Sequence, residues 1–177
     1  MTNTVRKWFL FKSLIGIGCI CTLFFAGAWA ERQRFELTRI DPPNLNNHPA
    51  YAQVTTVVGP AKLIFVAGQV DRPIDYKPRS NRCQHDDWYG QYLGTMENVQ
   101  RGLTAAGAGW NDVVFIRRYI TDWRAWHAMT KEKSGEFPDY WKGQRPPPST
   151  MIQVVGLSEP CQLIEVDVFA VVQDTND

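Results

Sequence analysis

The sequence predicts an α+β fold in which two helices cover one face of a five-stranded sheet. Runs of β-branched and aromatic residues alternate with helical patterns in the order strand, strand, helix, strand, helix, strand, strand. The 177 residues carry a net charge of +1 and are 44% hydrophobic, which excludes a disordered chain and gives no reason to expect phosphate-backbone binding. Because two helices can cover only one face of such a sheet, we expect a partner subunit to bury the other face.

The first thirty residues differ in composition from the remainder of the chain. They contain Arg6, Lys7 and Lys12 but no acidic residue, and an uncharged run ends in Ala28-Trp29-Ala30. Small residues at these two alanine positions are typical of a signal-peptidase site. We therefore interpret residues 1–30 as a signal peptide and expect a periplasmic or secreted protein with no membrane attachment after cleavage. The alternative is an uncleaved anchor, because residues 8–30 are almost long enough to span a bilayer.

The mature chain is mildly acidic and retains two cysteines. Cleavage after residue 30 removes three basic and no acidic side chains, which leaves 147 residues with a net charge of −2. This charge and the absence of a basic stripe argue against a nucleic-acid partner. Export would place Cys83 and Cys161 in an oxidising compartment. Both alternatives, a disulfide and two separate thiols, remain, because the sequence does not show the distance between the two cysteines.

The chain after the signal peptide begins with a polar, turn-rich segment. We interpret residues 31–48 as a surface leader and residues 49–177 as the folded domain, with regular structure expected from about Tyr51. Two short β-rich runs, at residues 54–58 and 63–66, are separated by Gly59-Pro60. This dipeptide interrupts a strand ladder, so the two runs predict a β-hairpin.

The remaining elements follow from hydrophobic periodicity and helix-end signals. Apolar residues at intervals of three and four predict a first helix that ends before Gly107, and Thr121-Asp122 is typical of the cap of a second helix that begins near Trp123. Trp126, Met129 and Phe137 are expected to face inward from that second helix. Strands are predicted at residues 113–120, 151–155 and 163–172.

Common catalytic and metal-binding motifs are absent from the sequence. It has no Gly-rich phosphate loop, no His-x-x-x-His or Cys-x-x-Cys pair and no Gly-x-Ser-x-Gly elbow. His85, Asp86 and Asp87 could together hold a metal ion, but a solvated loop is the favoured interpretation of this run. We therefore expect no metal.

Several segments occur in order and with characteristic spacing. They are Tyr51-Ala52-Gln53, Phe65-Val66-Ala67-Gly68-Gln69-Val70, Gln91 followed by Asn98-Val99, Leu103-Thr104-Ala105-Ala106-Gly107-Ala108, Asp112-Val113-Val114, Tyr119-Ile120-Thr121-Asp122 and Leu163-Ile164-Glu165-Val166. Together they resemble the Rid family, also called YjgF or L-PSP endoribonuclease-like. The resemblance covers residues 49–172 and implies a chorismate-mutase-like subunit that forms a homotrimer with ligand clefts at the subunit boundaries. Archetypal members hydrolyse reactive enamines and imines to a keto acid and ammonia without a metal or cofactor.

The resemblance also implies which residues form the site. The acidic residue of the last strand corresponds to Glu165, to which we assign the positioning of the attacking water. The tyrosine of the cleft corresponds to Tyr51 and the glycine of the hairpin loop to Gly68. Ser149 and Met151, at the start of the strand before the last, are expected to contact the ligand.

The chain departs from the family pattern at one position. Deaminases of the family carry an arginine where this chain has Ser149, and a hydroxyl cannot replace a bidentate guanidinium that holds a substrate carboxylate. Arg124 and Arg145 are two candidates to supply the cation from another direction, and the alternative for each is a solvated surface charge.

Two functions therefore remain. The first is a hydrolytic deaminase with an altered substrate, and the second is a non-catalytic trimeric module that binds a small molecule in the same cleft. The old family name points to a ribonuclease, but the acidic mature domain argues against that third class.

Overall fold

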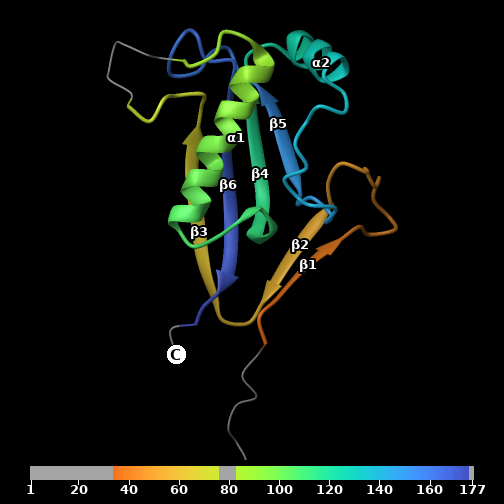
Figure 1. Cartoon of the computed structure of the whole chain (residues 1–177). Coiled ribbons are helices and arrows are strands. Elements are labelled where there is room, and N and C mark those ends of the chain that lie inside the picture. Colours follow the sequence, from red (N-terminus) through yellow and green to blue (C-terminus); the bar gives the residue numbers. More distant parts are fainter. Residues whose placement is uncertain (1–33, 76–82, 176–177) are drawn as a thin grey trace, which may run out of the picture. The chain divides into compact units, whose positions relative to one another are not determined.

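The structure is a computed structural model that describes residues 34–75 and 83–175. The signal peptide predicted at residues 1–30 lies outside this range. Among the residues that are described, no helix is both long and apolar enough to cross a membrane. The elements, in chain order, are β1 (Glu36–Ile40), β2 (Val54–Val58), β3 (Ala61–Gln69), α1 (Trp88–Ala105), the 3₁₀ helix η1 (Trp110–Asp112), β4 (Val113–Ile120), α2 (Trp123–Glu132), β5 (Ser149–Gln153) and β6 (Ile164–Gln173) (Figure 1).

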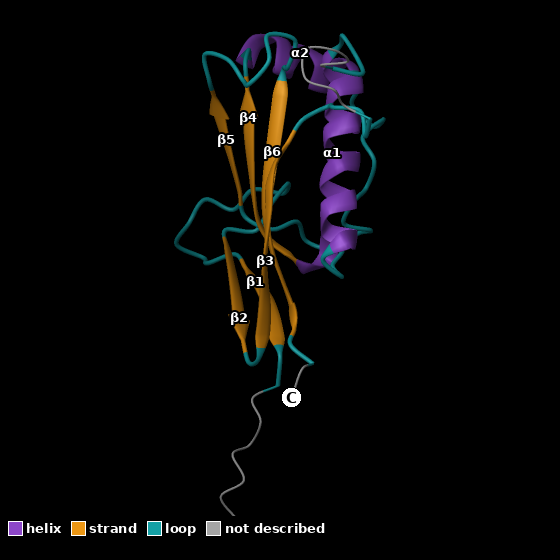
Figure 2. Cartoon of the chain, turned by 90° about the vertical axis from the view of Figure 1, so that its left-hand side faces the viewer, coloured by secondary structure: helices purple, strands orange, loops and turns teal. Residues whose placement is uncertain are grey.

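A mixed four-stranded sheet forms the centre of the fold. Its strand order is β3-β6-β4-β5, and only the pair β4 and β5 is parallel. A parallel pair needs a crossover connection, and α2 lies in the chain segment that joins β4 to β5. Figure 2 shows α1 lying along one face of this sheet. The predicted α+β fold, with two helices packed on a mixed sheet, is therefore confirmed.

The hydrophobic core lies between the helices and the sheet. Met96, Val99 and Leu103 of α1 are buried, as their spacing predicts, and they belong to one cluster with the buried residues of β3, β4 and β6. Close approach of helix and strand depends on Gly102, because a Cβ atom there would come within 2.9 Å of a methyl carbon of Val66. Trp126 and Met129 of α2 complete the cluster, whereas Phe137 packs against it from beyond the end of that helix.

The helix ends follow the capping signals in the sequence. Asp87 caps α1 by accepting a hydrogen bond from the backbone of Gly90 at 2.9 Å. Asp122 caps α2 and accepts from the backbone N–H groups of Arg124 and Ala125. Gly107 follows the end of α1 with a φ of 79°, a left-handed conformation that glycine adopts without steric cost.

The predicted hairpin between the two β-rich runs is wrong, and so is the five-stranded sheet. β2 pairs with β1 in a separate two-stranded sheet, and β3 pairs with β6. Gly59, with a φ of 96°, turns the chain between β2 and β3. Strand β1 belongs to the segment that we interpreted as a surface leader, so within the described residues regular structure begins at Glu36 rather than near Tyr51. Pairing partners distant in sequence leave no local signal, which explains both errors.

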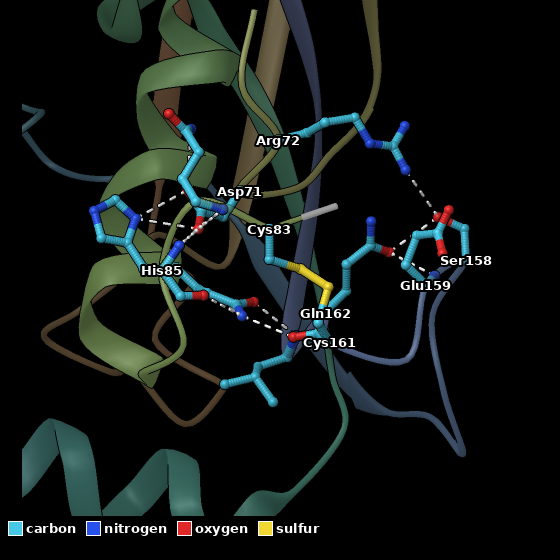
Figure 3. Close-up of a disulfide and its surroundings, with 11 residues drawn as sticks. Asp71, Arg72, Cys83, His85, Ser158, Glu159, Cys161 and Gln162 are labelled. Carbon is cyan, nitrogen blue, oxygen red and sulfur yellow. Dashed lines mark hydrogen bonds and ion pairs between the residues drawn. A yellow bond between two sulfur atoms is a disulfide. The ribbon is translucent and has the colours of Figure 1, made fainter. Parts of the chain in front are cut away.

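A disulfide joins Cys83 to Cys161 across 78 positions of sequence. It links the segment before α1 to the loop before β6 (Figure 3). Gln91 of α1 reinforces the link, because its amide nitrogen donates to the carbonyl oxygen of Cys161 at 2.8 Å and its amide oxygen accepts from the backbone of Leu163 at 2.8 Å. The start of β6 is thereby held against α1.

The same segment is anchored to the end of β3 by a buried carboxylate. Asp71 accepts hydrogen bonds from the backbone N–H groups of Gln84, at 3.1 Å, and His85, at 2.7 Å. The Asp71 side chain is fully buried, and a Cβ atom at Gly94 of α1 would overlap it. The disulfide and this carboxylate together fix the ends of β3 and β6 that lie side by side.

Reduction of the disulfide is expected to lower the free energy of unfolding by about 2–5 kcal/mol, because the cross-link removes chain entropy from the unfolded state. Urea unfolding of the oxidised protein, the reduced protein and the Cys83→Ser/Cys161→Ser variant tests this. The reduced protein and the double variant should unfold at similar, lower urea concentrations. Equal midpoints for the oxidised and reduced proteins would contradict the expected stabilisation by the disulfide.

Candidate functional site

The described residues form a hollow on each face of the four-stranded sheet. The first is a depression of about 500 Å³ on the face that the helices leave open. Leu157 and residues of β3, β4 and β6 line it, and they include Phe65, Gly68, Arg117, Tyr119, Glu165, Asp167 and Phe169. We call it the open-face hollow.

Glu165 and Gly68 lie in direct contact in the open-face hollow. Glu165 is the second residue of β6 and pairs in register with Tyr119 of β4. Gly68 lies at an irregularity near the end of β3, and a Cβ atom at this position would overlap the Glu165 carboxyl group. Only glycine leaves that space free. The structure therefore brings together two of the residues that the family resemblance singled out.

The pKa of the Glu165 carboxyl is raised above its ordinary value. Burial is the main cause, the negative charge of Asp167 adds to it, and the positive charge of Arg72 acts in the opposite direction. A carboxyl group with a raised pKa exchanges protons closer to neutral pH, which suits a general acid or base.

A charged pair forms the floor of the open-face hollow. The Nε and terminal nitrogen atoms of Arg117 donate to the Asp167 carboxylate at distances of 2.8 to 3.1 Å. This contact raises the pKa of Arg117. The guanidinium also lies over the ring of Phe169, 5.1 Å from its centroid. Because Asp167 neutralises the charge of Arg117 and fixes its side chain, this arginine forms part of the floor of the hollow. The sequence analysis did not identify either residue.

The second hollow, of about 350 Å³, lies on the helix-covered side of the sheet. We call it the helix-side hollow. Arg118 of β4 lines it, and one of its terminal nitrogens donates to the Ser149 hydroxyl at 2.5 Å. The other lining residues come from α1, α2, the loop after α2 and β5, and they are Tyr92, Trp126, Thr130, Ser134, Gly135, Phe137 and Met151.

Within one chain, the predicted site residues do not form a single cleft. Successive side chains of a strand point to opposite faces of a sheet. Ser149 and Met151 therefore share the helix-side face of β5, whereas Glu165 faces the open side from β6. The clefts were expected at subunit boundaries, so the placement of these residues on opposite faces of one subunit leaves that expectation a prediction.

The remaining predicted residues line neither hollow. Tyr51 stacks on His48 with ring centroids 4.9 Å apart. Arg124, in the first turn of α2, has an exposed side chain. Arg145 forms an ion pair with Asp41 at 2.8 Å and donates to two backbone carbonyl groups of the leader. Within this chain, neither arginine contacts Ser149 or lines either hollow, so a role for either as the replacing cation stays a prediction.

The cation beside Ser149 is Arg118, which the sequence analysis missed. A signal for it existed, because Arg117 and Arg118 are consecutive in a strand and one of them must face the helices. A charged residue on the helix-covered side of a sheet is uncommon without a polar partner or a function.

The segment considered as a metal site forms a different contact. The Nδ1 atom of His85 lies 3.1 Å from an oxygen of Asp71. Within residues 34–75 and 83–175, no group of three or more His, Cys, Asp or Glu side chains is placed to hold a metal ion.

Comparison with known proteins identifies the family. The model of the family described as Endoribonuclease L-PSP matches residues 45–172. The chain belongs to this family, the Rid or YjgF family of the sequence analysis. Similar solved structures include the Rid-family protein YyfB of Yersinia pestis, described as of unknown function, at 22% identity with a TM-score of 0.61, covering 77% of this chain and 98% of that one.

A second solved structure shares the fold of the Rid-family chain. It is a probable translation initiation inhibitor from Rhodopseudomonas palustris, at 18% identity with a TM-score of 0.51, covering 78% of this chain and 100% of that one. At these identities the likeness concerns the fold alone, so function has to be argued from the residues of the two hollows.

The contact between Gly68 and Glu165 predicts a measurable pKa change. In Gly68→Ala the added methyl group displaces the Glu165 carboxyl into solvent, so its raised pKa should fall toward the ordinary glutamate value. Carboxyl ¹³C chemical shifts followed against pH measure this. Gly156→Ala is the matched control, because a Cβ atom there meets nothing within 4 Å. An unchanged Glu165 pKa in Gly68→Ala would contradict the contact.

Proposed function

We propose that this Rid-family protein is a hydrolytic deaminase that converts a small imine or enamine to a carbonyl compound and ammonia. The observation that carries the proposal is Glu165, a half-buried carboxyl with a raised pKa that lies against Gly68 in the open-face hollow. The space over a glycine admits a small substrate next to this carboxyl.

The residues of the open-face hollow suit addition of water to a carbon–nitrogen double bond. Glu165 accepts a proton from water as the water oxygen bonds to the imine carbon. Glu165 passes this proton to the imine nitrogen, so the carbon then carries a hydroxyl and an amino group. As the carbon–nitrogen bond breaks, the hydroxyl proton is transferred to the nitrogen, which leaves as ammonia, and the carbon becomes a carbonyl. One water is consumed, and no electrons are transferred to or from the protein. Asp167 supports this role because its charge raises the pKa of Glu165.

The proposal includes a homotrimer with ligand sites at the subunit boundaries. Large apolar side chains on the open face support it, because Leu63 is 63% and Phe65 is 69% exposed in the single chain. The positions of Glu165 and Ser149 on opposite faces also support it, since residues of two subunits could then meet at one boundary. A second copy of the chain is the partner that this arrangement requires.

We also propose that the mature protein is exported. The basic, uncharged and small-residue pattern of residues 1–30 supports export, and so does the Cys83–Cys161 disulfide, because disulfides persist in oxidising compartments.

Export predicts a mature amino terminus at Glu31. Intact-mass and amino-terminal peptide measurements on protein from the periplasm or medium should show loss of residues 1–30. Ala28→Arg, which places a charge at one of the two small-residue positions, should block processing and serves as the comparison. Full-length protein in the wild-type sample would contradict cleavage and favour the anchor.

A second function, binding without catalysis, is favoured by the helix-side hollow. Its walls include Tyr92, Trp126 and Phe137, and aromatic walls are typical of small-molecule sites. A ribonuclease is not proposed, because neither hollow offers a set of basic side chains: the open-face hollow contains Arg117, which Asp167 neutralises, and the helix-side hollow contains Arg118.

Replacement of Glu165 tests the hydrolase. With an imine generated in the assay by an amino-acid oxidase, the wild-type protein should release ammonia faster than buffer does. Glu165→Gln keeps the shape but removes the proton acceptor, and its rate should be lower by about 10²–10⁴-fold. Glu36→Gln, at the exposed first position of β1, is the control and should keep the wild-type rate.

Two outcomes would overturn the hydrolase. Ammonia release at the buffer rate across imines of small, branched and aromatic amino acids would leave the binding module as the remaining function. Equal rates for the wild type and Glu165→Gln would remove Glu165 from the reaction.

A further inference from the structure

We propose that Arg118 makes the helix-side hollow a binding site for the carboxylate of a small organic acid with an aromatic or bulky apolar side group. The inference adds a substrate class to the proposed function. It rests on that function only for the hydrolysis that follows binding. Binding itself depends on residues of β4, β5, α1 and α2 that are distinct from Glu165 and Gly68.

The environment of Arg118 provides the first argument. Burial lowers the pKa of Arg118, although an arginine remains a cation at neutral pH. A guanidinium has five N–H donors, and among the described residues Arg118 has one hydrogen-bond partner, the Ser149 hydroxyl. No carboxylate in residues 34–75 and 83–175 lies within ion-pair distance of it.

Several other described arginines differ from Arg118 in having a carboxylate partner. Three of them each contact a carboxylate of the same chain, in the pairs Arg101–Glu97, Arg117–Asp167 and Arg145–Asp41. A half-buried cation without such a partner loses part of its hydration and gains no opposite charge in return. A ligand carboxylate in the helix-side hollow would supply that charge and could form two parallel hydrogen bonds with the guanidinium.

The walls of the hollow define the remainder of the ligand. Tyr92 and Trp126 are both 8% exposed, and their rings lie 6.0 Å apart. Phe137 contacts Tyr92 edge-on with a centroid distance of 5.1 Å, and Met151 of β5 adds an apolar thioether. A volume of about 350 Å³ between these side chains suits a single ring or a branched alkyl group.

Ser149 also acquires a role that follows from its contact. Its hydroxyl oxygen accepts a hydrogen bond from Arg118 and so fixes the guanidinium at the start of β5. An arginine at position 149 would place a second guanidinium against the first. Serine at position 149 avoids this contact between like charges and is therefore compatible with a cation supplied by Arg118 of β4.

Calorimetric titration of the purified protein with a matched pair of probes tests the inference. Phenylpyruvate carries a carboxylate, and 1-phenylpropan-2-one has a methyl group in its place. The wild type should bind phenylpyruvate at least about tenfold more tightly than the ketone, because hydrogen bonds to charged groups strengthen binding by roughly this factor or more. Arg118→Met should lose about 10- to 100-fold in phenylpyruvate affinity and little in ketone affinity.

Three further variants complete the design. Arg101→Met, which removes an exposed arginine of α1, should bind as the wild type does. Arg118→Met/Ser149→Arg should recover part of the lost affinity, because a guanidinium then enters the same hollow from β5. Met151→Trp fills the hollow and leaves Arg118 in place, so it should also weaken phenylpyruvate binding, and it serves if Arg118→Met does not fold.

The outcomes separate this inference from the proposed hydrolase. Undetectable phenylpyruvate binding by the wild type, or unchanged affinity in both Arg118→Met and Met151→Trp, would overturn the carboxylate site even if ammonia were released. Conversely, Arg118-dependent binding in a protein that releases no ammonia would support the site and leave the hydrolase overturned. Glu165→Gln should retain phenylpyruvate binding in either case.

Discussion

The packing of α1 and α2 on one face of the four-stranded sheet is the constraint on which the site depends. Because side chains alternate along each strand, this packing divides every strand into a helix-facing set and an open set. The helix-facing set forms the core, with buried residues such as Ile116, Ile120 and Val166. The open set contains Glu165 and Arg117 in a depression beside exposed apolar residues. The helix-facing side and the open side of the same sheet therefore carry chemically different side chains.

A disulfide and a buried carboxylate fix the end of the sheet at which the open-face hollow lies. The Cys83–Cys161 disulfide and the buried Asp71 carboxylate fix the segment before α1 against the ends of β3 and β6. Gly68 and Glu165 lie near these ends. The geometry around the Glu165 carboxyl group therefore does not depend on loop packing alone. Helix packing and the disulfide therefore both restrict the positions of Gly68 and Glu165.

Local patterns in the sequence predicted the elements well and their partners poorly. The helix periodicity, the cap at Asp122 and the β-rich runs arise from contacts within a few residues. The pairing of β2 with β1 instead of β3 depends on chain segments that meet only in the folded state. The placement of Glu165 and Ser149 on opposite faces has the same origin, because the face that a residue occupies follows from strand register and helix placement.

The sequence by itself determined the family and the order of elements from β2 to β6, because these are properties of residue identity and spacing. Only the tertiary structure decided where a cation would be found. Arg124 and Arg145 were the candidates nearest in sequence, yet Arg118 of the neighbouring strand contacts Ser149, because β4 and β5 lie in parallel register. Proximity across a sheet depends on that register, and no local pattern of residues encodes it.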